Sequence, residues 1–597
     1  MKINLLKRLL RSKAANLIAA FLMLNSTQAA TYYFQGISGG SLASAANWST
    51  NSATFVAGAV IPSAADDVYF NVATANNTTN SPTIYYSLAS ANRIFNSITM
   101  LNAGPTTFYR SSTLTNSSNT LEIGSGGFTV AAGAGPVTIG TVTSSTNFGG
   151  VTLRTAVNTT IANNSSSLLT LQNTLGSTAV NNGNIAMVTF GGTGTGGYVL
   201  ASGADNKASS NTNNVQLGIT MNNALATLAI NSTGNYSGGT ILNAGILSVG
   251  HNLALGLGTV TLNGGTMASA TIARTLANNF VFGGDFTLGA YGSAITLTGG
   301  IDLNNGTRSI TLANSATFNG NIINGTGLNV NSSSTTRSLT LAGNNTYTGD
   351  TIVNNAILNV NGSLSSAVVA STNSTVNVAG TVTKSTVSGG TLLVTGNGGE
   401  TIVNTGTATV NSGGVIGTTT INGSLLTVNG TAGNVLVNTG GTLGGSGSVG
   451  NVLLNGGTIA PGNSPGLLTA ANFNASNGSF VFELGATTTR GVTYDAINVT
   501  NLLTLGTNTA WIFQINGGYA FQQNDTYDLF NWSSIDTTGF DVSVLQAALP
   551  NLDTPNTNLA WDVNKFTTDG TISVIPEPHT STLASIALIL ALRKRKK

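Results

Sequence analysis

The chain has no cysteine and very little charge. Of its 597 residues, 6% are charged, well below the roughly 25% that is typical of soluble domains. The absence of cysteine excludes disulfides and thiolate chemistry, and it is compatible with export. Only 10 prolines are present, so proline-driven disorder is not expected. The two histidines, His251 and His579, lie in different parts of the chain and predict neither a metal site nor a catalytic triad.

The formal net charge of +2 comes from the two ends of the chain. Ten of the 20 basic residues lie in the terminal segments. The body of the chain, from Thr31 to Ile575, has 10 basic and 17 acidic residues and therefore a net charge of −7. An acidic body without a basic patch argues against nucleic acid as a partner.

Residues that favour turns and strands dominate the composition of the chain. The chain has 75 glycines and 41% hydrophobic residues, with Asn, Thr and Ser throughout. This composition predicts an almost entirely β fold with a long, narrow core. All four tryptophans lie outside residues 49–510, and other aromatic residues gather between Thr31 and Phe128. Because a repetitive interior has one width, we expect these large rings in caps at the ends of a repeat region.

One short segment occurs twice, with its copies 111 positions apart, and a partial third copy begins at residue 401. Each copy holds three apolar runs separated by Asn, Gly, Ser and Thr, which predicts three short strands joined by tight turns. The shared positions are Leu228, Tyr236, Gly238, Thr240, Leu247 and Val249 in the first copy, and Leu339, Tyr347, Gly349, Thr351, Leu358 and Val360 in the second. Such units stack because none buries its apolar face alone, so we expect the closing leucine and valine of each copy to point inward.

This pattern resembles the autotransporter-associated β-strand repeat, a motif of secreted proteins with Tyr-x-Gly-x-Thr between two apolar strands. The stretch Pro461-Gly-Asn463-Ser-Pro465-Gly466 is similar to the last rungs of autotransporter passenger domains. The resemblance implies a right-handed parallel β-helix, or β-solenoid, that is exported from a Gram-negative cell. We expect each rung of this solenoid to use about 20–25 residues.

Residues 1–29 have the features of a secretory signal peptide. A basic start is followed by an apolar run over residues 14–24 and then by small residues that end at Ala30. Cleavage is predicted after Ala29, with Thr27 and Ala29 as the small pair, and the general secretion machinery is the expected partner. The alternative is an N-terminal anchor helix, but the apolar run is shorter than the about 20 residues that span a bilayer.

The C-terminal tail combines a short motif, an apolar segment over residues 582–592 and a basic end. The residues of the motif and of the basic end are Pro576, Glu577, Pro578, Arg593, Lys594 and Arg595. The tail resembles the PEP-CTERM sorting signal, which an exosortase-like membrane enzyme reads, and it is also similar to what is catalogued as an ice-binding protein C-terminal domain. A helix here would be about 21 Å long, short of the roughly 30 Å hydrocarbon core. A transient stop is therefore favoured over a plain C-terminal anchor.

These features predict five parts of the chain. They are a signal peptide (1–29), an N-terminal cap with the first rungs (30–130), β-solenoid repeats (131–470), a C-terminal β cap (471–575) and a sorting tail (576–597). We expect export by machinery supplied in trans, because the tail has room for only one short helix. Transient association with the inner membrane would precede release to the cell surface or the extracellular matrix.

Candidate catalytic groups are few. The lyases and hydrolases built on β-helices need clustered carboxylates, or calcium held beside a basic residue. Asp66 and Asp67 form the only adjacent acidic pair, but neighbours on a strand point to opposite faces, so a turn or cap contact is the simpler interpretation. We expect Asp525 and Asp528 to cap a turn and His251 to lie in one. No cofactor or metal site is predicted.

The sequence therefore predicts a structural or adhesive surface protein, with extracellular polysaccharide as a candidate partner. A polysaccharide-active lyase or hydrolase is the first alternative, and ice binding is the second. Thr-x-Thr pairs that begin at Thr259, Thr407 and Thr418 would suit ice binding if they formed a flat array. They are scattered among Asn and Ser instead, which is ordinary for strand residues.

Overall fold

The computed structural model describes residues 29–34, 40–52, 60–70, 84–88, 92–111, 119–140, 148–178, 185–206, 216–289, 293–552 and 558–577. The predicted signal peptide up to residue 28 and the tail from Pro578 onward lie outside these ranges. The chain divides into two compact units. The first comprises residues 1–304 and 313–316, and the second comprises residues 305–312 and 317–597.

The first unit consists of short strands. They are β1 (Thr31–Phe34), β2 (Trp48–Ser49), β3 (Asp67–Phe70), β4 (Ile84–Ser87), β5 (Arg93–Met100), β6 (Thr106–Ser111), β7 (Asn119–Val130), β8 (Val137–Ile139), β9 (Phe148–Gly149), β10 (Val151–Thr155), β11 (Thr159–Asn163), β12 (Leu169–Leu171), β13 (Leu175–Ser177), β14 (Ile185–Gly191), β15 (Tyr198–Leu200), β16 (Ala204–Asp205), β17 (Gln216–Ile230), β18 (Thr240–Val249), β19 (Val260–Leu262), β20 (Thr266–Ser269), β21 (Arg274–Leu276), β22 (Phe280–Phe282), β23 (Phe286–Leu288) and β24 (Ile295–Leu297), with the 3-10 helix η1 (Ala45–Asn47). Strands β25 (Ile301–Leu312) and β26 (Ala316–Phe318) contribute residues to both units.

The second unit contains the remaining strands and two short α-helices. They are β27 (Ile322–Ser332), β28 (Ser338–Leu341), β29 (Asn344–Asn345), β30 (Thr351–Asn354), β31 (Ile357–Val360), β32 (Ser363–Ser371), β33 (Thr375–Val378), β34 (Thr381–Val394), β35 (Glu400–Val410), β36 (Val415–Ile416), β37 (Thr419–Ile421), β38 (Ser424–Val428), β39 (Thr431–Ala432), β40 (Val435–Asn438), β41 (Gly441–Gly445), β42 (Ser448–Val449), β43 (Val452–Pro461), β44 (Leu467–Ala470), β45 (Phe473–Leu484), β46 (Ala496–Ile515), β47 (Thr526–Asp528), β48 (Phe530–Asp536), β49 (Leu559–Asp562) and β50 (Thr571–Pro576), with η2 (Asn516–Gly518), α2 (Val542–Ala548) and α3 (Phe566–Asp569).

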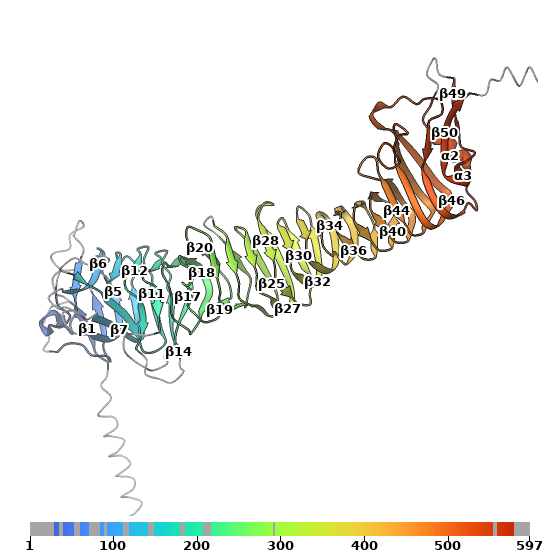
Figure 1. Cartoon of the computed structure of the whole chain (residues 1–597). Coiled ribbons are helices and arrows are strands. Elements are labelled where there is room, and N and C mark those ends of the chain that lie inside the picture. The colour runs from blue at the N-terminus through green and yellow to red at the C-terminus, as the bar shows by residue number, and fades with distance from the viewer. Residues whose placement is uncertain are drawn as a thin grey trace, which may run out of the picture. The chain divides into compact units, whose positions relative to one another are not determined.

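The predicted all-β class is confirmed, and parallel pairing dominates both units (Figure 1). Most strands pair in parallel with a strand further along the chain. The stretch of chain between a residue and its parallel partner is called a rung here. In the first unit β17 pairs with β18 and β18 with β20. In the second unit β28 pairs with β31 and β31 with β33. A separate antiparallel sheet of β47, β50 and β49 lies at the C-terminal end of the second unit.

The core of each unit is a column of apolar side chains in register. Leu228 pairs with Leu247, which pairs with Met267, and all three are buried. Leu339 and Leu358 begin an equivalent column in the second unit. Because side chains alternate along a strand, every second residue faces this column and the residues between them face outward.

Rungs in the middle of the second unit are shorter than predicted. Asn422 bonds its partner Asn438 across 16 residues, and Asn404 bonds Asn422 across 18 residues. The expectation of about 20–25 residues per rung is therefore wrong here. The rungs are short because two-residue turns such as Asn422-Gly423 replace longer loops between strands.

Large aromatic residues lie inside the first rungs. The ring centroids of Phe34 and Phe70 are 5.4 Å apart, and those of Phe70 and Tyr86 are 4.8 Å apart. Trp48 packs against Phe34 at 5.0 Å, and all four side chains are fully buried. Parallel pairing already begins at β1, which pairs with β3. In the predicted C-terminal cap it likewise continues from β45 through β46 to β48.

Candidate functional site: an amide-lined groove

The repeat motif builds the core. Tyr236 Oη lies 2.6 Å from Thr240 Oγ1, and both side chains are buried. Tyr347 and Thr351 repeat this contact at 2.5 Å in the second copy. Burial raises the pKa of both tyrosines, and the hydrogen bond to threonine opposes that shift. In each copy, the buried hydroxyls of tyrosine and threonine thus form a hydrogen bond with each other. These hydroxyls are therefore unavailable to a ligand.

The glycine between these residues is required by close packing. A Cβ on Gly349 would lie 1.5 Å from the carbonyl oxygen of Thr326, and one on Gly238 would lie 2.6 Å from that of Leu217. No side chain fits at either distance, so the backbone of one rung approaches the next only at glycine. The remaining shared positions are buried apolar residues: Leu228, Leu247, Val249, Leu339, Leu358 and Val360.

The candidate acids near the N-terminus make cap contacts. Asp66 accepts hydrogen bonds from the backbone N–H groups of Ser63 at 2.8 Å and Ala30 at 3.0 Å. Asp67 accepts from Asn96 and Ser97, so the two carboxylates face different partners. Burial raises the pKa of Asp66, but the hydrogen bonds from Ser63 and Ala30 together lower it by more.

The other polar candidates are also held in local structure. His251 Nδ1 accepts from the backbone N–H of Leu253 at 3.1 Å, which places it in a turn as predicted. Asp525 accepts from the backbone N–H of Gln522 at 2.7 Å and closes the predicted turn. Thr407 pairs with Thr391 on one side and with Leu425 on the other, so threonines do not continue from rung to rung at that position.

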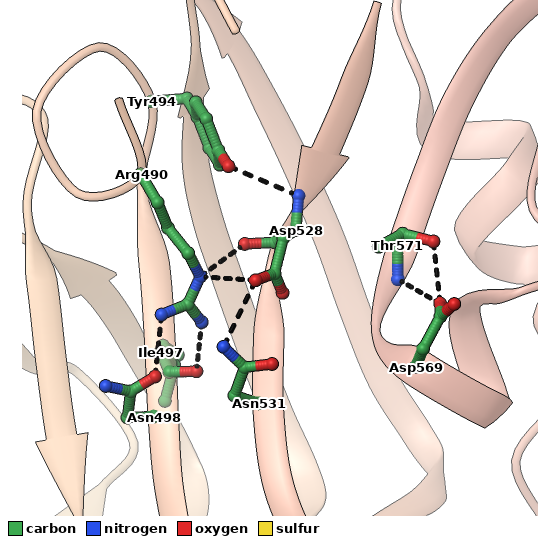
Figure 2. Close-up of polar contacts among 8 residues, drawn as sticks. All are labelled: Arg490, Tyr494, Ile497, Asn498, Asp528, Asn531, Asp569 and Thr571. Carbon is green, nitrogen blue, oxygen red and sulfur yellow. Dashed lines mark hydrogen bonds and ion pairs between the residues drawn. The ribbon is translucent and has the colours of Figure 1, made fainter. Parts of the chain in front are cut away.

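Asp528 does not cap a turn as predicted: it ends strand β47 and forms an ion pair that sequence reasoning missed (Figure 2). Arg490 Nε lies 3.0 Å from Asp528 Oδ2 and 2.8 Å from the Asp528 carbonyl oxygen. The other guanidinium nitrogens donate to Asn498 Oδ1 at 2.6 Å and to the Ile497 carbonyl at 2.9 Å. Since Arg490 bonds protein acceptors through all three nitrogens, it joins β46 to β47 and offers little to a substrate.

The stretch Asn463-Ser-Pro-Gly466 docks on two further acids. Ser464 has a positive φ of 84° and donates to Glu483 at 2.7 Å. Asp495 is buried and accepts from the backbone N–H groups of Gly466 at 2.7 Å and Glu483 at 2.8 Å. Burial raises the pKa of Asp495 to about 7, against the lowering effect of these two hydrogen bonds. These contacts hold the closing loop of the repeat region on β45.

A groove of about 510 Å³ lies on the outer face of the second unit. It runs across strands β37, β40, β43, β45 and β46. The lining residues are Thr418, Thr419, Thr420, Asn434, Val435, Leu436, Asn451, Val452, Leu453, Asn472, Phe473, Asn474, Leu502 and Thr504. Every lining residue that the structure describes is uncharged. The groove therefore presents amides, hydroxyls and aliphatic side chains.

Two columns of side chains form the groove. Val435 and Val452 are partners in register and point into the core, so the residues on either side of each valine point outward. Asn434 and Asn451 belong to the first outward column, which continues to Asn472. The second outward column is Thr420, Leu436, Leu453, Asn474 and Thr504 in register.

Hydrogen bonds fix how the asparagine amides point. The backbone N–H of Asn451 donates to Asn434 Oδ1 at 2.9 Å, and the backbone N–H of Leu502 donates to Asn472 Oδ1 at 3.2 Å. A backbone N–H can only donate, so these contacts identify the oxygen of each amide. Asn472 Nδ2 then donates to Asn451 Oδ1 at 2.7 Å. Within the described ranges, Nδ2 of Asn434 and of Asn451 has no hydrogen-bond partner.

A second asparagine ladder lies outside the groove and differs in its bonding. Asn422, Asn438 and Asn455 each donate through Nδ2 to the asparagine one rung earlier, at 2.8–2.9 Å, beginning with Asn404. Its amide donors are thus used within the ladder. Sequence reasoning missed both ladders and the groove, although Asn434-Val-Leu436 recurs 17 residues later as Asn451-Val-Leu453. That recurrence is the sequence signal from which the two columns of the groove could have been predicted.

The described residues contain no group of three or more His, Asp or Glu placed to hold a metal ion. In those same ranges, none of the helices has the length and apolar character needed to cross a bilayer. Predicted sorting residues Pro576 and Glu577 are exposed where β50 ends, while Pro578 and the basic end Arg593, Lys594 and Arg595 fall outside the described residues. Neither models of protein families nor curated proteins give a match to this chain.

Proposed function

We propose that this chain is an exported, right-handed parallel β-helix with a structural or adhesive role, and that it binds extracellular polysaccharide through the amide-lined groove. The observation that carries the proposal is the lining: asparagine amides and threonine hydroxyls beside exposed leucines, with no charged lining residue in the described structure. Sugars offer hydroxyl groups and apolar ring faces, and both need such partners.

The scaffold also suits adhesion. The core of the second unit is a continuous column of in-register apolar residues, so the outer face is held by many stacked strands. A groove on such a face is formed before the ligand arrives, which lowers the entropic cost of binding an extended polymer.

Two features support export and processing. If cleavage follows Ala29, the new α-ammonium group of Ala30 lies 3.0 Å from Asp66 Oδ1 and gains a charged partner there. At the other end, Pro576 and Glu577 are exposed directly after β50, within reach of an exosortase-like enzyme. We propose transient association with the inner membrane before release to the cell surface or matrix.

A glycan array of extracellular polysaccharides, read with matched variants, tests this function. Leu453 is 46% exposed in the groove, and Leu425 is 40% exposed outside it. Leu453→Asp should abolish polysaccharide binding, whereas Leu425→Asp should leave it unchanged. Equal loss in both variants, or no binding by the wild-type protein, would contradict the proposal. Release of new reducing ends from a bound polymer would instead favour the enzyme alternative.

A further inference from the structure

Resting on the polysaccharide-binding function above, we infer that the groove selects a neutral polysaccharide that carries acetyl groups, held with its carbonyl oxygens on Asn434 and Asn451 and its methyl groups on Leu436 and Leu453. An acetyl group joins a hydrogen-bond acceptor to a small apolar methyl. On each of two neighbouring rungs, the groove offers an amide N–H donor for the carbonyl oxygen and a leucine for the methyl group.

Two asparagine amides of the groove have N–H donors that the protein does not use. Nδ2 of Asn434 and of Asn451 carries two N–H donors each, and no described residue accepts from them. The amide oxygens are already engaged by donors within the protein. Each of these oxygens has one of its two lone pairs in use, so the column offers more free donors than free acceptors. A carbonyl oxygen matches it better than a hydroxyl group, because a hydroxyl also needs an acceptor.

The leucines of the second column supply apolar surface beside these donors. Leu436 and Leu453 lie two residues after Asn434 and Asn451 on the same outward face, so each rung pairs one amide donor with one leucine. Leu453 is 46% exposed, which leaves apolar surface that a methyl group can cover. Neighbouring rungs repeat the pair about 4.8 Å apart. Each rung can therefore hold one acetyl group.

Charge argues against an anionic polymer. Asp536 follows Thr504 in register at the end of the leucine column. Hydrogen bonds from Thr538 lower the pKa of Asp536, so this carboxylate is ionised at neutral pH. No described residue of the groove lining is basic, so a uronate or a sulfate would meet repulsion without a counter-charge.

The test compares two oligosaccharides with the same β-1,4-linked backbone, chitotetraose with its N-acetyl groups and cellotetraose with hydroxyl groups in their place. Calorimetry on the full chain should show about tenfold tighter binding of the acetylated oligomer. Asn451→Asp keeps the oxygen that accepts from Asn472 and removes the N–H donors. It should weaken the preference, because Asn434 is then the only one of the two asparagines that keeps its N–H donors in the groove.

Asn404→Asp is the matched control. It adds the same charge, keeps the oxygen that accepts from Asn422 and lies outside the groove. This variant should retain the full preference for chitotetraose. Equal binding of both oligomers by the wild-type protein, lost in Leu453→Asp, would overturn the acetyl inference and leave polysaccharide binding intact. Binding of neither oligomer in calorimetry, with no neutral polysaccharide bound on the array, would overturn both.

Discussion

A double-mutant cycle on Tyr236 and Thr240 would measure what the repeat motif contributes to the fold. Thr240 Oγ1 lies 3.0 Å from the Leu255 carbonyl oxygen and Tyr236 Oη lies 3.3 Å from that of Ala254, so either hydroxyl can be the donor in the 2.6 Å contact between them. Tyr236→Phe removes the tyrosine hydroxyl from this contact and should cost about 1 kcal/mol. Thr240→Val also leaves the buried Leu255 carbonyl without its donor, and should cost about 1–3 kcal/mol.

The two losses should not add. Both variants remove the same hydroxyl contact, so the double variant should be less destabilised than the sum by about 1 kcal/mol. Because a long repeat chain need not unfold in one step, the assay is native-state hydrogen exchange at the amides of β17 and β18. Tyr347→Phe with Thr351→Val is the control, and it should act on β30 and β31 instead. Additive losses, or an unaffected Tyr236→Phe protein, would refute this account of the motif.

Three further predictions concern the core, pH and the tail. Leu358→Asp should prevent accumulation of folded protein, because an unpaired buried carboxylate costs several kcal/mol; wild-type circular dichroism and melting would contradict the inward orientation. Burial raises the pKa of Asp495 to about 7, so its contribution to the free energy of unfolding is full below pH about 4 and is lost as pH rises through 7. Asp495→Asn should flatten that pH dependence in denaturant titrations, and an unchanged slope would count against it. Mass spectrometry of exported protein should find no peptide from residues 582–597, and recovering one would favour a permanent anchor.

The all-β class and the core of the repeat followed from the sequence because both depend on local periodicity. Residues 358–361, Leu-Asn-Val-Asn, alternate between apolar and polar, and this alternation identifies the face that is buried. Rung length was harder to predict from the sequence, because it depends on how tightly each turn closes. Turns such as Asn422-Gly423 shorten a rung without changing its strands.

The groove could not be predicted from local patterns. Its two columns exist only because Asn434 and Asn451, or Leu436 and Leu453, come into register in neighbouring rungs. Which amide atoms remain unused depends on partners in a further rung, such as Leu502. The contact between Arg490 and Asp528 is equally non-local, because a turn before β46 meets the end of β47.

Hydrogen exchange with and without chitotetraose tests the central claim most directly, because it locates the bound ligand on the chain. Amides at residues 434–438 and 451–454, which carry the paired asparagines and leucines, should exchange more slowly when the oligosaccharide is bound. Residues 228–249 of the first unit should exchange at the same rate in both samples. Protection of the first unit alone, or no change at residues 434–438 and 451–454 under saturating ligand, would contradict the assignment of the groove as the binding site.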